Sequence, residues 1–105
     1  MLALLIACTP SPARFLERGF EIQCEQWEAC DPDGFAEHYD DVDACFDGEW
    51  ELSGSYLSEF EEEGCSYDGS RAADCLHDLE QIDCAVWNDD TTAPESCYYV
   101  WTCPE

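Results

Sequence analysis

Apolar residues recur at helical spacing along most of this chain. The first stripe repeats at steps of three or four residues and consists of Leu16, Phe20, Cys24, Trp27 and Cys30. Such spacing places these side chains on one face of an α-helix. The stripe stops at residues 31–34, Asp-Pro-Asp-Gly, where proline and glycine favour a turn. The pattern therefore predicts a first helix that ends at this turn.

Two shorter stripes follow the predicted turn. The second stripe consists of Phe35, Tyr39, Val42, Cys45 and Phe46. Asp47-Gly48 directly after it predicts a helix end. The third stripe consists of Tyr56, Leu57 and Phe60. Ser53 or Ser55 is suited to cap this third helix and Gly64 to end it.

The clearest stripe lies in the second half of the chain and consists of Ala72, Cys75, Leu76, Leu79 and Ile82. Asp68 or Ser70 is the expected cap of this helix. A polar loop at residues 88–92 precedes a last short helix, expected to start near Pro94 and to include Cys97, Val100 and Trp101. Val, Ile and Thr are few and alternation is rare, which disfavours a β-rich fold. The chain is therefore predicted to be all-α, a small disulfide-rich domain of four to five short helices.

The chain is strongly acidic. It has 105 residues, with 26 Asp plus Glu against three basic residues and a formal net charge of −23. This length limits it to one small domain, and the basic residues are Arg14, Arg18 and Arg71. Nucleic acid carries the same sign of charge, which excludes it as a partner. Four Trp, five Tyr and five Phe supply the apolar material for a folded core despite the charge.

Nine cysteines indicate a disulfide scaffold in an oxidising compartment. Cys8 stands apart because it ends an apolar run, Leu2 to Ala7, that is too short to cross a bilayer. Its context, Leu5-Ile6-Ala7-Cys8, resembles the lipobox of bacterial lipoproteins. The resemblance implies cleavage before Cys8, lipid on its sulfur and amine, and a signal peptide at residues 1–7 that is truncated at its N-terminus. The alternative is a chance apolar start before an ordinary thiol.

Setting Cys8 aside leaves an even number of cysteines, as a disulfide-bonded exported protein prefers. The remaining eight, enough for four bridges, are Cys24, Cys30, Cys45, Cys65, Cys75, Cys84, Cys97 and Cys103. Thr9-Pro10-Ser11-Pro12 is interpreted as a stiff tether. We expect residues 8–13 to be a lipidated tether and residues 14–105 a disulfide-stapled helical domain. Thr9 is not the Asp associated with inner-membrane retention, so the resemblance implies a membrane anchor in the outer membrane, on its periplasmic or surface side.

Helix geometry limits which cysteines can pair, because bonded cysteines need Cα atoms within about 7 Å of each other. A turn at residues 31–34 brings one pair together, and a turn near residue 89 places two further pairs opposite each other. The last two cysteines are then left for the fourth bridge. The resulting hypothesis, one of on the order of a hundred possible pairings, is Cys24–Cys45, Cys30–Cys65, Cys75–Cys103 and Cys84–Cys97.

Motifs for chemistry are weak. No Cys-x-x-Cys pair indicates a zinc site, and no Gly-x-Ser-x-Gly indicates a nucleophile. An EF-hand aligned on Gly34 fails at its first ligand position, Ala29. His38 and His77 are interpreted as surface residues, and acidic runs such as Asp40-Asp41 as solvated faces. We therefore assign no catalytic residue, no metal ligand and no cofactor.

The favoured interpretation of function is a non-enzymatic, lipid-anchored structural or binding module with an unidentified protein or glycan partner. One alternative is a calcium- or cation-binding module, and another is a small hydrolase or enzyme inhibitor. Trp50 and Trp87 lie near predicted loops or helix ends. We interpret them as core residues, with an exposed anchor at a binding surface as the alternative.

A looser likeness covers about a third of the chain besides the lipobox. Its residues are Cys65-Ser66-Tyr67-Asp68, Ala72-Ala73-Asp74-Cys75-Leu76, Cys84, Pro94 and Cys97. Together with Leu5-Ile6-Ala7-Cys8, this pattern resembles the small acidic cysteine-rich lipoproteins of delta-type proteobacteria. That resemblance implies an exported lipoprotein and no particular activity.

Overall fold

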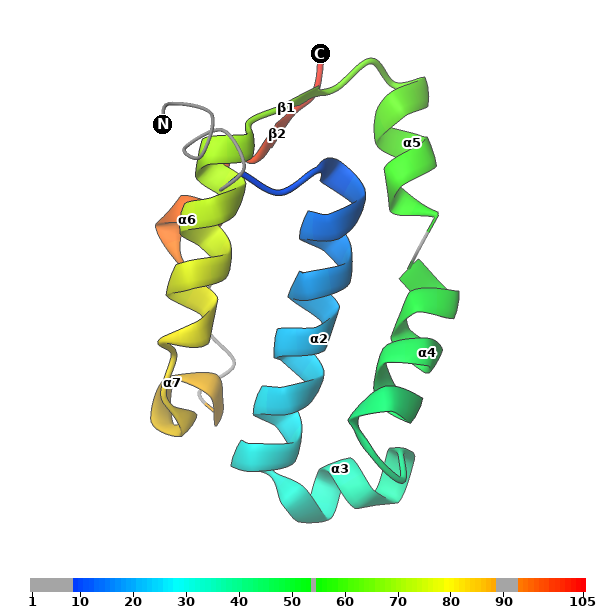
Figure 1. Ribbon diagram of the computed structural model, residues 1–105, viewed down its shortest axis with the longest axis vertical. Helices are drawn as coiled ribbons and strands as arrows, with labels where there is room; N and C mark the ends of the chain where they lie inside the picture. Colours follow the sequence, from blue (N-terminus) through cyan, green and yellow to red (C-terminus); the bar gives the residue numbers. More distant parts are fainter. Residues whose placement is uncertain (1–8, 54, 89–92) are drawn as a thin grey trace, which may run out of the picture.

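The computed structural model describes residues 9–53, 55–88 and 93–105. Its longer helices are α2 (Pro12–Cys30), α3 (Pro32–His38), α4 (Val42–Ser53), α5 (Tyr56–Glu62) and α6 (Gly69–Glu80). Helix α2 runs through the middle, with α6 on one side, α4 and α5 on the other, and α3 across one end (Figure 1). Most tertiary contacts of α2 are with α4 and α6, so α2 is the central element of the fold.

Short elements complete the domain. They are helix α7 (Cys84–Asn88), the 3₁₀ turn η1 (Glu95–Cys97) and the strands β1 (Ser66–Tyr67) and β2 (Trp101–Thr102). The two strands pair antiparallel at the end of the molecule opposite α3 (Figure 1). Apart from this pair, regular structure in the described residues is helical. The predicted fold class, a small all-α disulfide-rich domain, is confirmed.

Aspartates begin several of the helices. Within the described residues, a carboxylate accepts a hydrogen bond from a backbone N–H three residues ahead at Asp31, Asp41, Asp68 and Asp83. These bonds satisfy donors that the first turn of a helix leaves unpaired, and the negative charge complements the helix dipole. Ser11 does the same for α2 by accepting from the Arg14 N–H at 3.1 Å. Part of the acidic composition therefore has a local structural role.

Two helix boundaries differ from the predictions. Residues 31–34 do not simply end a helix, because Asp31 caps α3 and Pro32 occupies its first turn. The predicted second helix breaks at Tyr39, whose backbone is extended, and restarts as α4, which continues through Gly48. A Cβ atom on Gly48 would lie 2.7 Å from a Tyr39 ring carbon. Gly48 therefore permits close packing of Tyr39 on α4 and does not end the helix.

The predicted last helix is also wrong. Only Glu95–Cys97 forms a helical turn, and it is a single 3₁₀ turn. Tyr98 is extended, Tyr99 has a positive φ of 67°, and Trp101 begins strand β2. The chain leaves the helical region at this point because Trp101–Thr102 pairs with β1, a partner more than thirty residues earlier in the sequence.

The core consists of two small clusters, each built around a disulfide. The first joins α2, α3 and α4 and comprises the buried residues Cys24, Phe35 and Cys45, with Trp27, Tyr39 and Val42 packed against them. The second joins α6 to the C-terminal segment and comprises Ala72, Cys75 and Val100, with Phe15, Tyr67, Leu79, Cys97 and Trp101 around them. A chain of this size buries too little surface for a large continuous core, so cross-links at the cluster centres are expected to matter.

Within the described residues the cysteines form four disulfides, which are Cys24–Cys45, Cys30–Cys84, Cys65–Cys103 and Cys75–Cys97. The predicted Cys24–Cys45 bridge is confirmed, because α3 turns the chain back and lays α4 beside α2. The three other predicted bridges, Cys30–Cys65, Cys75–Cys103 and Cys84–Cys97, are wrong. Two of these predictions assumed a helical hairpin with its turn near residue 89, and Cys30–Cys65 was the pair that remained.

The chain after α6 follows a different path from the predicted hairpin. Helix α7 packs on α2, which brings Cys84 to Cys30. The turn η1 packs on α6, which brings Cys97 to Cys75. Cys65 directly precedes strand β1 and Cys103 directly follows β2. Pairing of the two strands therefore places these cysteines side by side. Each correction therefore follows from a tertiary contact between segments distant in sequence.

Candidate functional site

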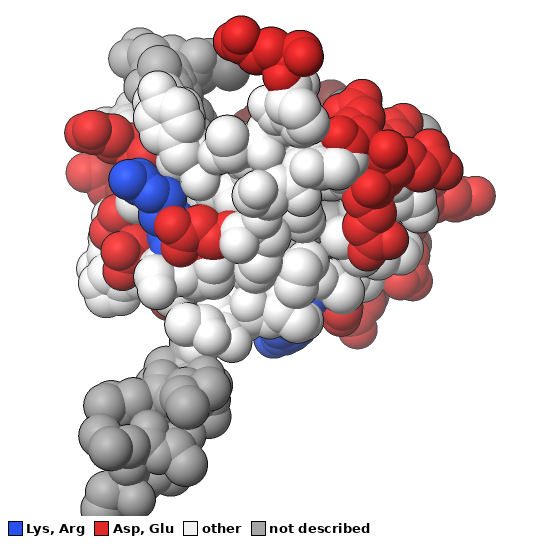
Figure 2. Space-filling model, turned by 90° about the horizontal axis from the view of Figure 1, so that it is seen from above, with Lys and Arg blue, Asp and Glu red and all other residues white. Residues whose placement is uncertain are grey.

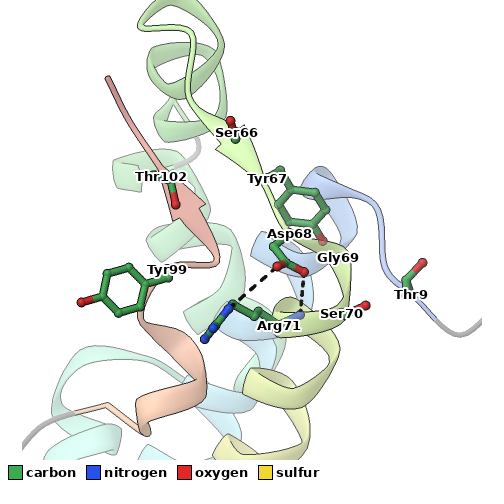
Figure 3. A pocket seen from close by; sticks show the side chains of 9 residues that line it. All are labelled: Thr9, Ser66, Tyr67, Asp68, Gly69, Ser70, Arg71, Tyr99 and Thr102. Atoms are coloured by element: carbon green, nitrogen blue, oxygen red, sulfur yellow. Dashed lines mark hydrogen bonds and ion pairs between the residues drawn. The ribbon is translucent and has the colours of Figure 1, made fainter. Parts of the chain in front are cut away.

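A hollow of about 540 Å³ lies where the two strands, the start of α6 and the chain ahead of α2 meet (Figure 3). Its lining residues are Thr9, Ser66, Tyr67, Asp68, Gly69, Ser70, Arg71, Tyr99 and Thr102. Most of these residues carry a hydroxyl group, and two of them are aromatic. They come from four segments of the chain, so only the folded domain assembles them.

A rigid backbone frame holds this hollow. Strands β1 and β2 pair antiparallel, and the Asp68 N–H donates to the Val100 carbonyl oxygen at 2.9 Å just beyond the paired residues. The Cys65–Cys103 disulfide closes the other end of the strand pair. Below the frame, the Cys75–Cys97 disulfide fixes η1 to α6. Covalent bonds on both sides therefore restrict the movement of the segments that line the hollow.

Asp68, Arg71 and Tyr99 form a chain of contacts across the hollow. One carboxylate oxygen of Asp68 accepts from the Arg71 backbone N–H at 3.1 Å, and the other lies 3.8 Å from Arg71 Nε. The guanidinium of Arg71 then lies over the Tyr99 ring, 5.8 Å from its centroid. Figure 3 shows the Arg71 guanidinium between the Asp68 carboxylate and Tyr99. This cation–π contact orients an exposed aromatic ring beside the hollow.

Tyr99 has an uncommon backbone conformation. Its φ of 67° lies in the left-handed region, which a residue with a large side chain rarely adopts. Tyr99 is 69% exposed as a residue, whereas the next residue, Val100, is only 2% exposed and belongs to the second core cluster. Burial of Val100 and pairing of β2 maintain the strained backbone, and the ring is turned out to solvent as a result.

Tyr67 connects the hollow to the chain that precedes α2. Its hydroxyl donates to the Pro10 carbonyl oxygen at 2.6 Å, and its ring packs 4.9 Å from Trp101 and 6.3 Å from Phe15, between centroids. Burial raises the pKa of the Tyr67 phenol, and the nearby charge of Asp68 raises that pKa further. The phenol therefore stays protonated as a hydrogen-bond donor. Pro10, which was expected in the tether at residues 8–13, is hydrogen-bonded to the domain.

The charge at this hollow differs from that of the whole chain. Its charged lining residues are Asp68 and Arg71, which form an ion pair and so balance each other. Figure 2 looks onto the end of the molecule that carries the strands, with uncharged residues across its middle and acidic residues mainly at its margins. A ligand in the hollow would therefore meet little net charge, although the chain carries −23.

A second hollow of about 380 Å³ lies between α2 and α6. Its lining includes Thr9, which also lines the first hollow, as well as Arg14 and Arg18. Acidic partners hold both arginines: Arg14 lies 2.9 Å from Glu21, and Arg18 lies 2.8 Å from Glu25 and 3.1 Å from Glu80. The hydrogen bond to Glu25 raises the pKa of Arg18 above its ordinary value. With Arg71 in the first hollow, all three basic residues of the chain line one of these two hollows.

The residues singled out from the sequence are distributed over the whole domain. Cys8, the predicted lipidation site, lies outside the described residues, as do Asp89 and Asp90. His38 and His77 are exposed on helices, in agreement with the surface interpretation. Within the acidic run that begins at Asp40-Asp41, Asp41 caps α4.

One group in the described residues has metal-ligand spacing. It contains Glu63, Cys65 and Cys103, whose potential ligand atoms lie within 4.8 Å of one another. The two sulfur atoms are bonded to each other, so they are not thiolates and the group does not resemble a metal site.

Trp50 and Trp87, the tryptophans near predicted helix ends, are each half-buried. Trp50 is half-buried against Phe20 and Phe46, with ring centroids 5.9 Å and 5.8 Å away. Trp87 is half-buried and lines a mostly apolar groove beside α2. The exposed aromatic residue at the candidate site is instead Tyr99, which the sequence pattern did not indicate. No local sequence signal predicts a left-handed tyrosine, because the strand pairing that imposes it is non-local.

Four disulfides are typical of a domain that resides in an oxidising compartment outside the cytoplasm. Among residues 9–53, 55–88 and 93–105, none of the helices has both the length and the apolar character that a membrane span requires. Comparison of the chain with protein-family models, curated proteins and solved structures finds no match.

Proposed function

We propose that this chain is a lipid-anchored module of the cell envelope, which binds a partner through its disulfide-stapled domain and does not catalyse a reaction. The observation that carries the proposal is the pairing of the cysteines. The eight cysteines of the described residues bond to one another, so none of them is left as a partner for Cys8. A lone cysteine after Leu5-Ile6-Ala7 is what lipid attachment requires.

The position of Pro10 supports a close attachment to the membrane. Its carbonyl oxygen is bound by Tyr67, and only Thr9 separates it from Cys8 in the sequence. One residue of extended chain spans about 3.5 Å. A lipid on Cys8 would therefore hold the end of the domain that carries the hollow directly beside the membrane surface.

The contacts of the candidate site favour binding over catalysis. The carboxylate of Asp68 caps α6 and pairs with Arg71, so both of its oxygens already have partners within the fold. A general acid or base instead needs to reach the substrate atom with which it exchanges a proton. The remaining polar groups of the hollow are mostly hydroxyls, which bind a ligand through hydrogen bonds.

Metabolic labelling tests the anchor. Cells that express the chain under a lipoprotein export signal are fed an alkyne fatty acid, and the labelled protein is followed in the membrane fraction. We expect label on the wild-type protein, none on Cys8→Ala, and an intact mass that corresponds to an acylated cysteine at the N-terminus. A product that retains residues 1–7 with an unmodified Cys8 would overturn the proposal.

Membrane sorting can be tested with a second variant. The resemblance to lipoproteins implies that Asp after the lipidated cysteine retains a protein in the inner membrane, and that this chain, with Thr9 there, reaches the outer membrane. Thr9→Asp is therefore expected to shift the labelled protein between membrane fractions, and Thr9→Ser is the matched control. Equal distribution of both variants would contradict the outer-membrane assignment while leaving the lipid anchor in place.

A further inference from the structure

We propose that the hollow between β1, β2 and α6 binds a neutral saccharide, such as one end of an envelope glycan. The inference deepens the binding half of the proposed function and does not require the lipid. It rests on the charge balance of the hollow, on its hydrogen-bonding groups and on the fixed, exposed ring of Tyr99.

Charge selects a neutral ligand. The guanidinium of Arg71 is the basic group in the hollow, and Asp68 already pairs with it. An anion would have to compete with that carboxylate and would also approach a chain of net charge −23. A cation would be repelled by the guanidinium of Arg71. An uncharged polar ligand avoids both the competition with Asp68 and the repulsion by Arg71.

The polar groups of the hollow match the chemistry of sugar hydroxyls. Ser66, Ser70 and Thr102 are exposed residues whose hydroxyls both donate and accept hydrogen bonds. Asp68 and Arg71 add an acceptor and a planar donor side by side, a combination that fits two neighbouring hydroxyls of a sugar ring. The volume of about 540 Å³ suits a short oligosaccharide.

Tyr99 supplies the apolar surface that a sugar ring requires. The C–H face of a pyranose stacks on aromatic rings, and Tyr99 is an exposed aromatic residue. The Arg71 guanidinium packs on one face of its ring, and the left-handed backbone of Tyr99 sets the direction of the side chain. A ligand that contacts the ring would explain why Tyr99 keeps a strained backbone and an exposed aromatic side chain. The disulfides around the frame keep the platform in place before binding, which reduces the entropy lost on association.

The test uses the full chain with Cys8→Ser, so that failure of lipidation does not affect the result. Maltotriose, cellotriose and tri-N-acetylchitotriose are titrated separately, at millimolar concentrations, into ¹⁵N-labelled oxidised protein. We expect at least one of them to shift the amide resonances of residues 66–71 and 99–102 and to receive saturation transfer from the protein. Inorganic phosphate serves as the anionic probe and is expected to produce no such shifts.

Two matched pairs of variants assign the binding to the hollow. Tyr99→Gly removes the ring and suits a positive φ, so it retains the fold, and it is expected to weaken saccharide binding by at least about tenfold. Tyr98→Ala, at a neighbouring exposed tyrosine outside the hollow, is expected to bind as the wild type does. Arg71→Gln is expected to weaken binding, whereas Arg14→Gln is not.

Three outcomes would overturn the inference. These are the absence of saturation transfer to all three saccharides, shifts that map away from the hollow, and undiminished binding by Tyr99→Gly. If phosphate shifts the resonances of residues 66–71, the hollow binds an anion, and the proposal of a neutral ligand is wrong. Loss of fatty-acid labelling with intact saccharide binding would contradict the lipid anchor alone, so failure of one proposal is distinguishable from failure of the other.

Discussion

The phenol of Tyr67 donates a 2.6 Å hydrogen bond to the carbonyl oxygen of Pro10. Fifty-seven positions separate the two residues in the chain, and the bond joins the segment before α2 to the strand that precedes α6. The same ring packs on Trp101 of β2. Tyr67 therefore links the proposed anchor, the strand pair and the hollow, and its ionisation state affects all three.

Alkaline pH should weaken this link. The pKa of Tyr67 is raised above its ordinary value of 10.0, chiefly by burial, so the folded state favours the protonated phenol. The resulting stabilisation is complete below pH 10.0 and is lost as the pH rises through the folded-state pKa. Tyr67→Phe removes this dependence and also the hydrogen bond, which contributes about 1 kcal/mol at neutral pH.

Urea unfolding of wild type, Tyr67→Phe and the exposed-site control Tyr98→Phe tests this prediction. The stability difference between wild type and Tyr67→Phe should shrink as the pH increases from neutral to strongly alkaline, while Tyr98→Phe follows the wild type. A difference that stays constant over this range would contradict the assigned role of the phenol.

Two disulfides join α2 to other helices, and the buried one, Cys24–Cys45, should stabilise the fold more than Cys30–Cys84. Cys24 and Cys45 are 0% exposed, and their sequence separation is 21, against 54 for Cys30 and Cys84. If only the entropy of loop closure mattered, Cys30–Cys84, which closes the longer loop, would stabilise the fold by roughly 1 kcal/mol more than Cys24–Cys45. Removal of two buried sulfur atoms costs about 2 kcal/mol in lost packing.

We therefore expect Cys24→Ala with Cys45→Ala to lower the free energy of unfolding more than Cys30→Ala with Cys84→Ala. Denaturant unfolding of the two double variants measures the order directly. The reverse order would indicate that chain entropy outweighs core packing. A non-reducing peptide map of the wild type establishes beforehand which cysteines are joined.

Two helical glycines should respond in opposite ways to alanine. A Cβ atom on Gly19, in the interior of α2, would have no neighbour within 4 Å, so Gly19→Ala should stabilise the protein by about 0.5–1 kcal/mol. On Gly48, in α4, the same atom would lie 2.7 Å from the Tyr39 ring, so Gly48→Ala should destabilise it. Thermal unfolding of both variants tests the packing of Tyr39, and stabilisation by Gly48→Ala would show that the ring moves aside without cost.

Arg18 should contribute more to stability than Arg14. The Arg18 side chain is 27% exposed and pairs with Glu80 on α6 as well as with Glu25 on its own helix, whereas Arg14 is 52% exposed and pairs within α2. Arg18→Met should therefore cost about 1 kcal/mol at low salt, and Arg14→Met less than about 0.5 kcal/mol. Both costs should decrease at high NaCl, as measured by urea unfolding, because salt screens the pairs. Equal costs at low salt would argue against a bridge between α2 and α6.

Calcium should stabilise the domain only as a screening ion. The carboxylates of Asp31, Asp41, Asp68 and Asp83 already accept hydrogen bonds at helix starts, so they are poorly placed to gather around one cation. Millimolar calcium and magnesium should therefore raise the melting temperature equally, because both reduce repulsion among the acidic side chains. A larger shift with calcium that a chelator reverses would instead favour a calcium-binding module.

Interactions between residues a few positions apart were predictable from the sequence. The apolar stripes indicated the helical class, Asp68 was one of the two expected caps of α6, and α5 ends two residues before Gly64, whose φ is 74°. These features depend on hydrogen bonds and side-chain spacing within one or two helical turns. The Cys24–Cys45 bridge was also predictable because the chain reverses between its two helices, although this reversal contains the short helix α3.

Only the tertiary structure determined the remaining bridges and the candidate site. A two-residue strand has no periodicity to detect, yet the pairing of β1 with β2 places Cys65 beside Cys103 and turns Tyr99 outward. The packing of α7 on α2 likewise selects Cys84 as the partner of Cys30. Sequence periodicity reports which face of a segment is apolar, whereas a disulfide or a binding hollow requires atoms from distant segments to meet within a few ångströms, and that distance is decided by how the segments pack.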